Sequence, residues 1–479
     1  MSDIDFTALL EREVAPQEIR VATTVSVALE TLAEQARAHR SLLSTDPRRT
    51  LEAIIAAIDG KIAEQVNLIL HHPEFQQAEA TWRGLHFLVL AADPGPQMKI
   101  KLFDISKREL IRTLRKFRGT AWDQSPIFRK VYEEEYGQFG GQPYGVLIGD
   151  YYMDHGPQDT QLLGDMAMIA AAAHAPFIAG ASPTVLQMDS WAELANPRDL
   201  TRIFRTAEYA PWRSLRGSED ARYLGLCLPR VLARLPYGTA TEPLDAFDFE
   251  EDVDGPDASR FLWTNAVYAM AANIARAFNL YGWCVRIRGI ETGGAVEGLP
   301  AHRFPTADGD TDLRCSTEVA LSERREAELA MNGFIPLVHR KNADFPAFIG
   351  AQSLQQPQEY DDPAATTNAN LAARLPYLLA TCRFAHYLKC MVRDKVGTSL
   401  DRVQIQHWLQ SWLRHYIDGS PDTSSEEWKA AHPLEEGKVT VDEKDGEPGK
   451  YEAKFYLRPH YQLEGVTAAI RLVSRLASQ

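Results

Sequence analysis

Two short segments near the C-terminal end, each alternating between apolar and polar residues, constrain the fold of this chain most strongly. Alternation with a period of two predicts strands, because successive side chains of a strand point to opposite faces. The residues between the two segments, Asp445-Gly446-Glu447-Pro448-Gly449, are typical of a turn. The pattern therefore predicts a β-hairpin. The apolar positions of its two strands are Val439, Val441, Tyr451, Ala453, Phe455 and Leu457.

A hairpin of two strands is only marginally stable in water and leaves unpaired N–H and C=O groups on both edges. We therefore expect that either the core of the chain covers it or another chain adds strands to it. An amphipathic helix is expected after the hairpin, from about residue 461 to 476. These features define a C-terminal part, 436–479.

The rest of the chain divides into an N-terminal helical segment, 1–45, and a core, 46–435, which we expect to contain two subdomains. Asp46-Pro47 predicts a helix start, and apolar residues recur at steps of three and four as far as Ile69. The core alternates short strands with helices, which indicates an α/β fold. Strands are expected at 99–103, 145–149, 284–288 and 334–338, with the last at a sheet edge because of Pro336. Helices are expected at 167–173, 263–278, 375–396 and 403–417, with a polar linker at 357–367.

Composition excludes several classes of protein. The 479 residues suggest two or three domains, and the formal net charge of -14 argues against a nucleic-acid binder. Five separated cysteines without a C-x-x-C pair favour a reducing, cytoplasmic location. The first residues, Met1 to Asp5, lack an apolar signal segment, and no apolar run approaches the roughly 18 residues that a membrane span needs. We expect no membrane insertion.

No motif in the chain predicts catalysis, a cofactor site or a metal site. The sequence contains no G-x-x-x-x-G-K-[ST], H-E-x-x-H or G-x-S-x-G motif, and the glycines at 289–298 favour a turn. Cys382, His386 and Cys390 share one helix face, but their ends are about 12 Å apart at 1.5 Å per residue. We therefore expect a core histidine with two apolar cysteines and no zinc site. Glu250-Glu251 would point to opposite sides of a strand.

The segment 212–230 is dense in arginine, acidic and aromatic residues. Guanidinium forks favour buried or interfacial carboxylates, so we interpret the segment as a packing and ion-pair cluster. The residues alone leave open whether it acts within the chain or between subunits. The residues assigned to the cluster are Arg213, Arg216, Glu219, Asp220 and Arg222.

Ordered motifs from about residue 46 to the end resemble the large sheath subunit of the bacterial type VI secretion system, the TssC/VipB family. Each motif is weak by itself, and their order and coverage make the combination specific. They are Thr81–Leu85, Tyr136–Pro143, Gly149–Tyr151, Ala173–Ile178, the arginine-rich segment, Gly293–Val296 with Leu299-Pro300, Gly333–Ile335, Leu375–Tyr377, Ala385–Tyr387, Pro448-Gly449 and Arg458–His460.

The resemblance implies a phage-tail-sheath-like α/β fold and a structural role without enzymatic activity. It implies pairing with a small sheath subunit (TssB/VipA-like) and polymerisation with further copies around an inner tube (Hcp-like) on a baseplate. The hairpin would be the centre of a sheet shared with small subunits of neighbouring protomers. A ClpV-type AAA+ ATPase would contact an N-terminal helix, here Phe6, Leu9 and Leu10. The alternatives are an α/β enzyme of unknown substrate and an adaptor that does not polymerise.

Overall fold

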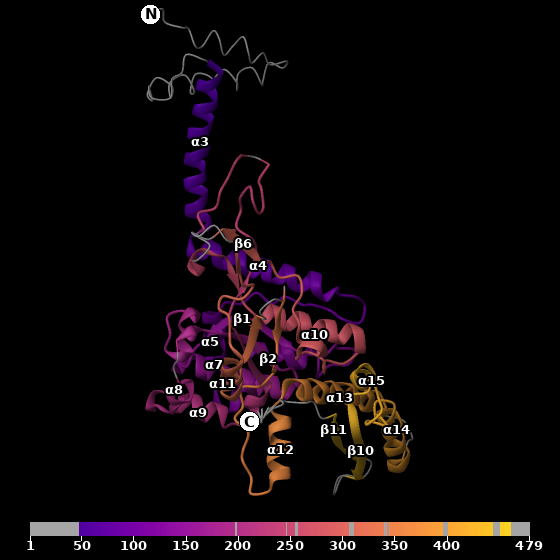
Figure 1. Cartoon of the computed structure of the whole chain (residues 1–479). Coiled ribbons are helices and arrows are strands. Elements are labelled where there is room, and N and C mark those ends of the chain that lie inside the picture. The colour runs from indigo at the N-terminus through magenta and orange to yellow at the C-terminus, as the bar shows by residue number, and fades with distance from the viewer. Residues whose placement is uncertain are drawn as a thin grey trace, which may run out of the picture. The chain divides into compact units, whose positions relative to one another are not determined.

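The computed structural model describes residues 47–196, 199–245, 247–253, 257–305, 311–339, 343, 345–395, 401–443 and 451–460 (Figure 1). The chain forms two compact units, Met1–Glu79 with Arg234–Leu262, and Ala80–Ala233 with Trp263–Gln479. The expected N-terminal segment 1–45 and the final helix 461–476 lie outside the described residues.

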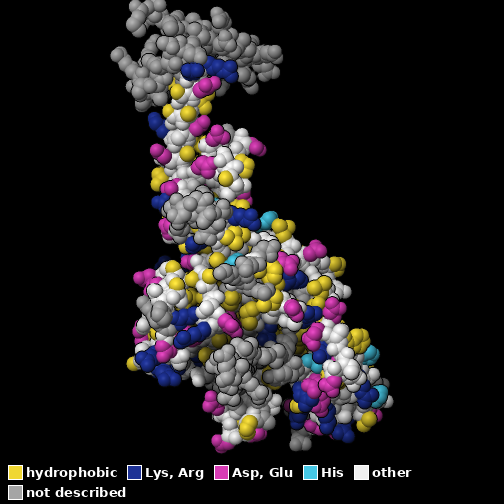
Figure 2. All heavy atoms as spheres, viewed as in Figure 1, with side chains coloured by type: hydrophobic (Ala, Val, Ile, Leu, Met, Phe, Trp, Pro, Cys, Tyr) yellow, Lys and Arg dark blue, Asp and Glu magenta, His cyan; other side chains and the backbone are white. Residues whose placement is uncertain are grey.

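The first unit contains α3 (Pro47–Leu70), the first turns of α4 (Pro73–Ala92) and the segment 234–262. The break at His72-Pro73 follows from proline, which is tolerated only in the first turn of a helix. Arg234 is buried and joins the segment to α4, because its guanidinium donates to Glu79 at 2.7 Å and to Glu251 at 2.5 Å. The helical period predicted for α3 is confirmed, and Ile55 and Ile62 on this helix are exposed. Figure 2 shows hydrophobic side chains at the surface among the charged ones.

A five-stranded mixed sheet forms the core of the second unit, as the predicted α/β class requires. Its order is β1 (Leu147–Met153), β2 (Phe177–Ala181), β3 (Leu224–Leu228), β8 (Ile335–His339) and β9 (Pro346–Phe348). The first four strands are parallel and β9 is antiparallel to β8. β2 and β3 are buried at every position, because helices α7 (Pro157–Ala173) and α10 (Val267–Tyr281) both pack on this sheet.

The predicted edge position of 334–338 is wrong, since β8 lies between β3 and β9. Pro336 is compatible with this inner strand because it lies where the strand changes from one neighbouring strand to the other. The ladder with β3 ends at the Leu228–Pro336 pair, and the ladder with β9 begins at Leu337. The changeover between the two neighbours therefore coincides with the residue that has no N–H donor.

Two other predicted strands, 99–103 and 284–288, do not form. Lys99 donates to Gln142 at 3.0 Å and Lys101 pairs with Glu135, so side chains replace the expected ladder. In the second segment Arg286 donates to the Glu291 carbonyl at 2.7 Å. The expected linker 357–367 is also partly helical, because α12 spans Pro363–Ala372.

A close approach of two elements explains why a glycine is required in the motif Thr81–Leu85. A Cβ atom at Gly84 would lie 2.3 Å from a ring carbon of Tyr268 and 2.6 Å from the hydroxyl of Thr264. Thr264 in turn donates to the Ala80 carbonyl at 2.7 Å, which holds α4 against this site. A side chain here would force the helix away from α10.

We therefore expect Gly84→Ala to destabilise the second unit by about 1–3 kcal/mol through overpacking. Gly164→Ala is the matched control, because the nearest atom to its new Cβ would be Leu215 Cδ1 at 3.8 Å. The control should be unchanged or more stable by about 0.5–1 kcal/mol, as alanine replaces glycine inside a helix. Urea-unfolding midpoints measure both effects, and equal midpoints for the two variants would contradict the packing argument.

Candidate assembly site at the C-terminal hairpin

The predicted hairpin is confirmed. Strands β10 (Leu434–Glu443) and β11 (Tyr451–Pro459) pair antiparallel, with Val439 opposite Phe455 and Val441 opposite Ala453. The two strands form a sheet of their own and do not join the five-stranded sheet. Figure 1 shows the hairpin beside helices α13 (Leu375–Asp394) and α14 (Arg402–Arg414).

One face of the hairpin is anchored in a small hydrophobic core. Val439 and Val441 are each 1% exposed, and α14 covers them with Leu409 and Leu413. Gly437 permits this contact, since a Cβ atom there would lie 2.8 Å from Leu413 Cδ2. Of the predicted residues on β11, Ala453, Phe455 and Leu457 border the same core, whereas Tyr451 is exposed.

The base of the hairpin is held by a buried polar cluster. The Asp418 backbone N–H donates to the Leu434 carbonyl at 2.9 Å, where β10 begins. The Asp418 carboxylate accepts from the Ser420 N–H at 3.0 Å and from the Ser424 hydroxyl at 2.9 Å. His460, just after β11, donates to the His432 carbonyl at 2.9 Å. Both ends of the hairpin are therefore fixed to the segment that follows α14.

The outer edge of β10 is covered by the chain itself, which is the first of the two expected alternatives. The side-chain amide of Gln410 donates to the Gly437 carbonyl at 3.0 Å and accepts from the Val439 N–H at 2.8 Å. Gln406 accepts from the Val441 N–H at 3.2 Å. These contacts, between residues 27 to 35 positions apart, supply the missing partners. No short sequence motif indicates these hydrogen bonds.

The outer edge of β11 is the free one. Residues opposite each other in an antiparallel pair either exchange both hydrogen bonds or none. The Val439 N–H is bonded to Gln410, so Val439 and Phe455 form a pair of the second kind and the Phe455 N–H points outward. The Val441 N–H is bonded to Gln406, so Val441 and Ala453 also exchange no hydrogen bonds and the Ala453 N–H points outward. Within the described residues no hydrogen bond from outside the hairpin reaches either N–H group.

Two arginines of the predicted cluster, Arg213 and Arg216, donate hydrogen bonds to backbone carbonyls. Arg213 donates at 2.6 Å to the carbonyls of Phe204 and Thr206. Arg216 is buried and donates to the carbonyls of Leu354 at 3.0 Å and Met331 at 3.2 Å. Burial lowers the pKa of Arg216 to about 10, so it stays charged at neutral pH.

Arg222 lies over the ring of Tyr223, 5.4 Å from its centroid. No ion pair within 4.0 Å joins Arg213, Arg216 or Arg222 to Glu219 or Asp220 in the part of the chain that the structure describes. The expected ion pairs are thus replaced by carbonyl contacts that tie α9 (Ala210–Arg216) to residues between 7 and 138 positions away. A contact between subunits through this segment stays a prediction.

The helix face with Cys382, His386 and Cys390 holds no metal-ligand arrangement. His386 Nε2 donates to the Ala173 carbonyl at 2.9 Å, which joins α13 to the end of α7. Burial lowers the pKa of His386 to about 4, so the imidazole is neutral at pH 7. Among the described residues, no group of three His, Cys, Asp or Glu side chains could hold a metal ion.

His386 should make stability depend on pH. The unfolded histidine has a pKa of about 6.5, so between pH 6.5 and 4 the unfolded chain binds a proton that the folded chain does not. We expect the free energy of unfolding of the second unit to fall by about 2 kcal/mol between pH 7 and pH 5 because of this group.

His386→Gln keeps an N–H donor and does not titrate, so it should remove this contribution to the pH dependence. Urea midpoints at both pH values test this, with exposed His407→Gln as control. An unchanged pH dependence in His386→Gln would refute the assignment.

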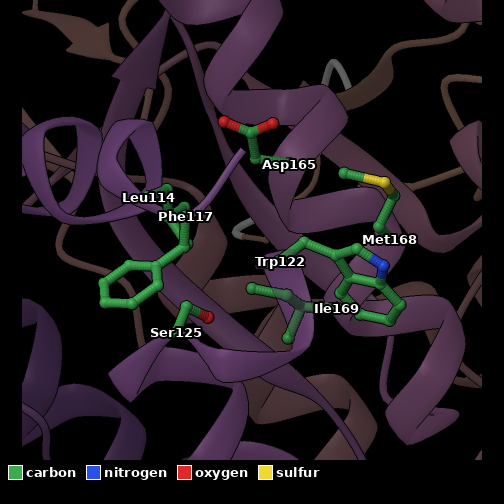
Figure 3. A pocket seen from close by; sticks show the side chains of 7 residues that line it. All are labelled: Leu114, Phe117, Trp122, Ser125, Asp165, Met168 and Ile169. Carbon is green, nitrogen blue, oxygen red and sulfur yellow. The ribbon is translucent and has the colours of Figure 1, made fainter. Parts of the chain in front are cut away.

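The described residues show no catalytic constellation. Glu250 and Glu251 diverge, since Glu251 binds Arg234 and Glu250 accepts from the Thr239 N–H at 2.9 Å. A hollow of about 210 Å³, including space open to solvent, lies beside α5 (Lys107–Lys116) and α7 (Figure 3). Its one carboxylate, Asp165, is 3.7 Å from Arg118. The lining residues are Leu114, Phe117, Trp122, Ser125, Asp165, Met168 and Ile169.

The described residues thus combine an α/β core with an anchored hairpin whose β11 edge has no hydrogen-bond partner among them. Residues 52–355 match the family VipB, described as EvpB/VC_A0108, tail sheath N-terminal domain. Residues 364–476 match VipB_2, described as EvpB/VC_A0108, tail sheath gpW/gp25-like domain. The chain therefore belongs to the VipB tail-sheath family, and it is a structural subunit of a contractile sheath and not an enzyme.

The comparisons include one relative and two solved structures. The chain is 62% identical over 474 residues to the type VI secretion system sheath protein TssC1 of Pseudomonas aeruginosa PAO1. The match covers 99% of this chain and 95% of that protein. The anti-feeding prophage baseplate has a chain with 12% identity and a TM-score of 0.40, over 78% of this chain and 83% of that one. The contracted helical sheath of the same particle gives 12% identity and a TM-score of 0.36, over 65% and 66%.

Membership of the family implies polymerisation into a sheath with a small sheath partner. The described residues include no helix that is long and apolar enough to cross a membrane.

Proposed function

We propose that this chain is the large subunit of a type VI secretion sheath and that its C-terminal hairpin is the site where neighbouring protomers share strands. The observation that supports this best is that the outer edge of β11 has no partner among the described residues, on a hairpin whose inner face is already anchored. A strand added there gains main-chain hydrogen bonds without any refolding of this chain. The strand would come from a small sheath subunit.

The anchoring of the hairpin suits a part that transmits force. Val439 and Val441 are buried, and Asp418 and His460 hold the base, so a pull on an added strand acts on the second unit through a packed core. The added ladder itself would have no packed counterpart among the described residues and could bend. Protomers joined in this way can rotate as rigid bodies and stay connected while the lattice contracts. Energy stored in the extended lattice would drive the contraction. The change would not need a nucleotide bound to this chain.

The remaining partners follow from the same proposal. The polymer would surround an inner tube protein and start at a baseplate in the cytoplasm. A ClpV-type ATPase would recycle the contracted form by contacting Phe6, Leu9 and Leu10, which lie outside the described residues. We retain the division into 1–45, 46–435 and 436–479 as functional parts of the proposed subunit.

Ala453→Pro tests the shared sheet. Proline removes the outward N–H of β11 and leaves the ladder with β10 intact, because the Val441–Ala453 pair exchanges no hydrogen bonds. We expect the complex with the small sheath subunit to form normally and tubes to shorten at least about tenfold, since each junction loses a donor. Electron microscopy of co-expressed chains measures tube length.

Ala453→Val is the matched control, because it changes the side chain and keeps the N–H donor. It should form tubes of normal length. Tubes of normal length from Ala453→Pro would remove the β11 edge from the assembly. Loss of the complex in both variants would show that the small subunit depends on this side chain and not on the edge.

A further inference from the structure

The exposed side of α5 concentrates positive charge in an acidic chain. Residues 107–118 contain six Lys or Arg residues and one acidic residue, whereas the whole chain has a net charge of -14. Leu110 and Leu114 bury one side of the helix in the core. Four cations at steps of three and four residues lie on the opposite side and are exposed. We call them the basic row, which consists of Arg108, Arg112, Arg115 and Lys116.

The other charges of this segment already have partners. Lys107 donates to the Asp159 carboxylate at 2.6 Å, and Arg118 lies 3.7 Å from Asp165. The single acid, Glu109, belongs to the capping box at the start of α5. The basic row itself receives no hydrogen bond or ion pair from the residues that the structure describes. Its four like charges lie within about 12 Å along the helix, so they repel one another and would be stabilised by an acidic surface.

The first unit of the same chain offers such a surface. Residues 235–259 contain eight acidic residues and no Lys or Arg. Exposure alternates along 248–252, because Phe249 and Glu251 are buried and the carboxylates between them point outward. We call the exposed carboxylates of this segment the acidic run, which consists of Asp245, Asp248, Glu250 and Asp252.

The acidic run has capacity for further cations. Asp245 and Asp248 have no hydrogen bond or ion pair among the described residues. The Glu250 carboxylate accepts from the Thr239 N–H at 2.9 Å, and Asp252 pairs with Arg260 at the surface. Each of these carboxylates can still accept from a guanidinium. At about 3.3 Å per residue the stretch 248–252 spans about 13 Å, close to the length of the basic row.

We propose that the basic row of one copy binds the acidic run of a second copy of this chain, as an ionic contact between sheath protomers. The inference rests on the proposed function, because it needs many copies of the chain side by side. Charge and length favour this occupant. A nucleic acid or an anionic membrane would also meet the rest of a chain that carries 14 excess negative charges, which opposes binding.

The contact joins two different surfaces and is therefore heterologous. A pair of copies held in this way leaves one basic row and one acidic run unused, so a third copy can bind at either end. Heterologous contacts that do not close into a ring generate a helical polymer. The contact would thus extend a tube in one direction and is separate from the C-terminal hairpin.

Its energetic character follows from its exposure. Ion pairs at the surface contribute little stability each and are screened by salt. Complementary rows of charge instead speed encounter, fix the register of two surfaces and exclude wrong neighbours. We therefore expect the contact to set how fast and how far tubes grow, with growth slowing as ionic strength rises.

Charge reversal on each side tests the contact in the complete chain co-expressed with its small subunit. Arg112→Glu with Arg115→Glu should shorten tubes at least about fivefold, because attraction between the rows becomes repulsion. Asp245→Lys with Asp248→Lys should shorten them similarly. Electron microscopy measures tube length in each case.

The decisive variant combines both reversals in one chain. Opposite signs then face each other again across the contact, so tubes should recover at least about half of the wild-type length. Damage to the fold would instead add up in the combined variant. Arg303→Glu with Arg324→Glu is the matched control, since it changes the net charge of the second unit equally at exposed positions outside the basic row. It should form tubes of normal length.

Two results would overturn the inference, namely normal tubes from either reversal and no recovery in the combined variant. Absence of tubes from the wild-type chain would instead reject the proposed function.

A crosslink in wild-type tubes identifies the occupant without any substitution. A carbodiimide joins the Lys116 amine directly to a carboxylate that contacts it. In tubes grown from a mixture of isotope-labelled and unlabelled chains, we expect Lys116 to be joined to the acidic run of a differently labelled chain. A crosslink from Lys116 only to the small subunit, or only within one chain, would reject a second copy as the occupant.

Discussion

Every backbone N–H and C=O of a strand needs a partner, and this requirement organises the whole second unit. Strands β2, β3 and β8 meet it by lying inside a sheet that helices cover. The hairpin cannot join that sheet, and its two edges meet the requirement in different ways. Side chains of α14 satisfy β10, whereas the outward groups of β11 have no partner in the part of the chain that the structure describes. The asymmetry between the two edges is therefore the feature from which the proposed assembly follows.

The hairpin can serve as a link only because the layer beneath it is rigid. Trp283 stacks on Phe384 with their ring centroids 4.1 Å apart, and Tyr416 contacts both rings edge-on. Aromatic contacts of this kind add to the free energy of burial and fix side-chain orientation. His386, on the same helix as Phe384, bonds to the end of α7, which packs on the main sheet. The path from hairpin to sheet thus passes through packed side chains and one buried hydrogen bond.

Local periodicity predicted those parts of the fold whose causes are local. The hairpin, its apolar positions Val439 and Val441 and the helical period of α3 follow from residue types a few positions apart. Predictions failed where a distant partner decided the outcome. Lys101 pairs with Glu135 and does not join a strand ladder. Pro336 is tolerated inside the sheet because the ladder with β3 ends there and the ladder with β9 begins at the next residue. The carbonyl acceptors of Arg216 lie 115 and 138 residues away, so no pattern around the arginine could indicate them.

The choice of glutamine at the β10 edge has a physical reason. A primary amide offers both a donor and an acceptor, so one side chain can satisfy the Gly437 carbonyl and the Val439 N–H together. Lysine could satisfy only the carbonyl and glutamate only the N–H. One neutral amide therefore satisfies both outward groups of the β10 edge, and the edge is covered without burying a charge.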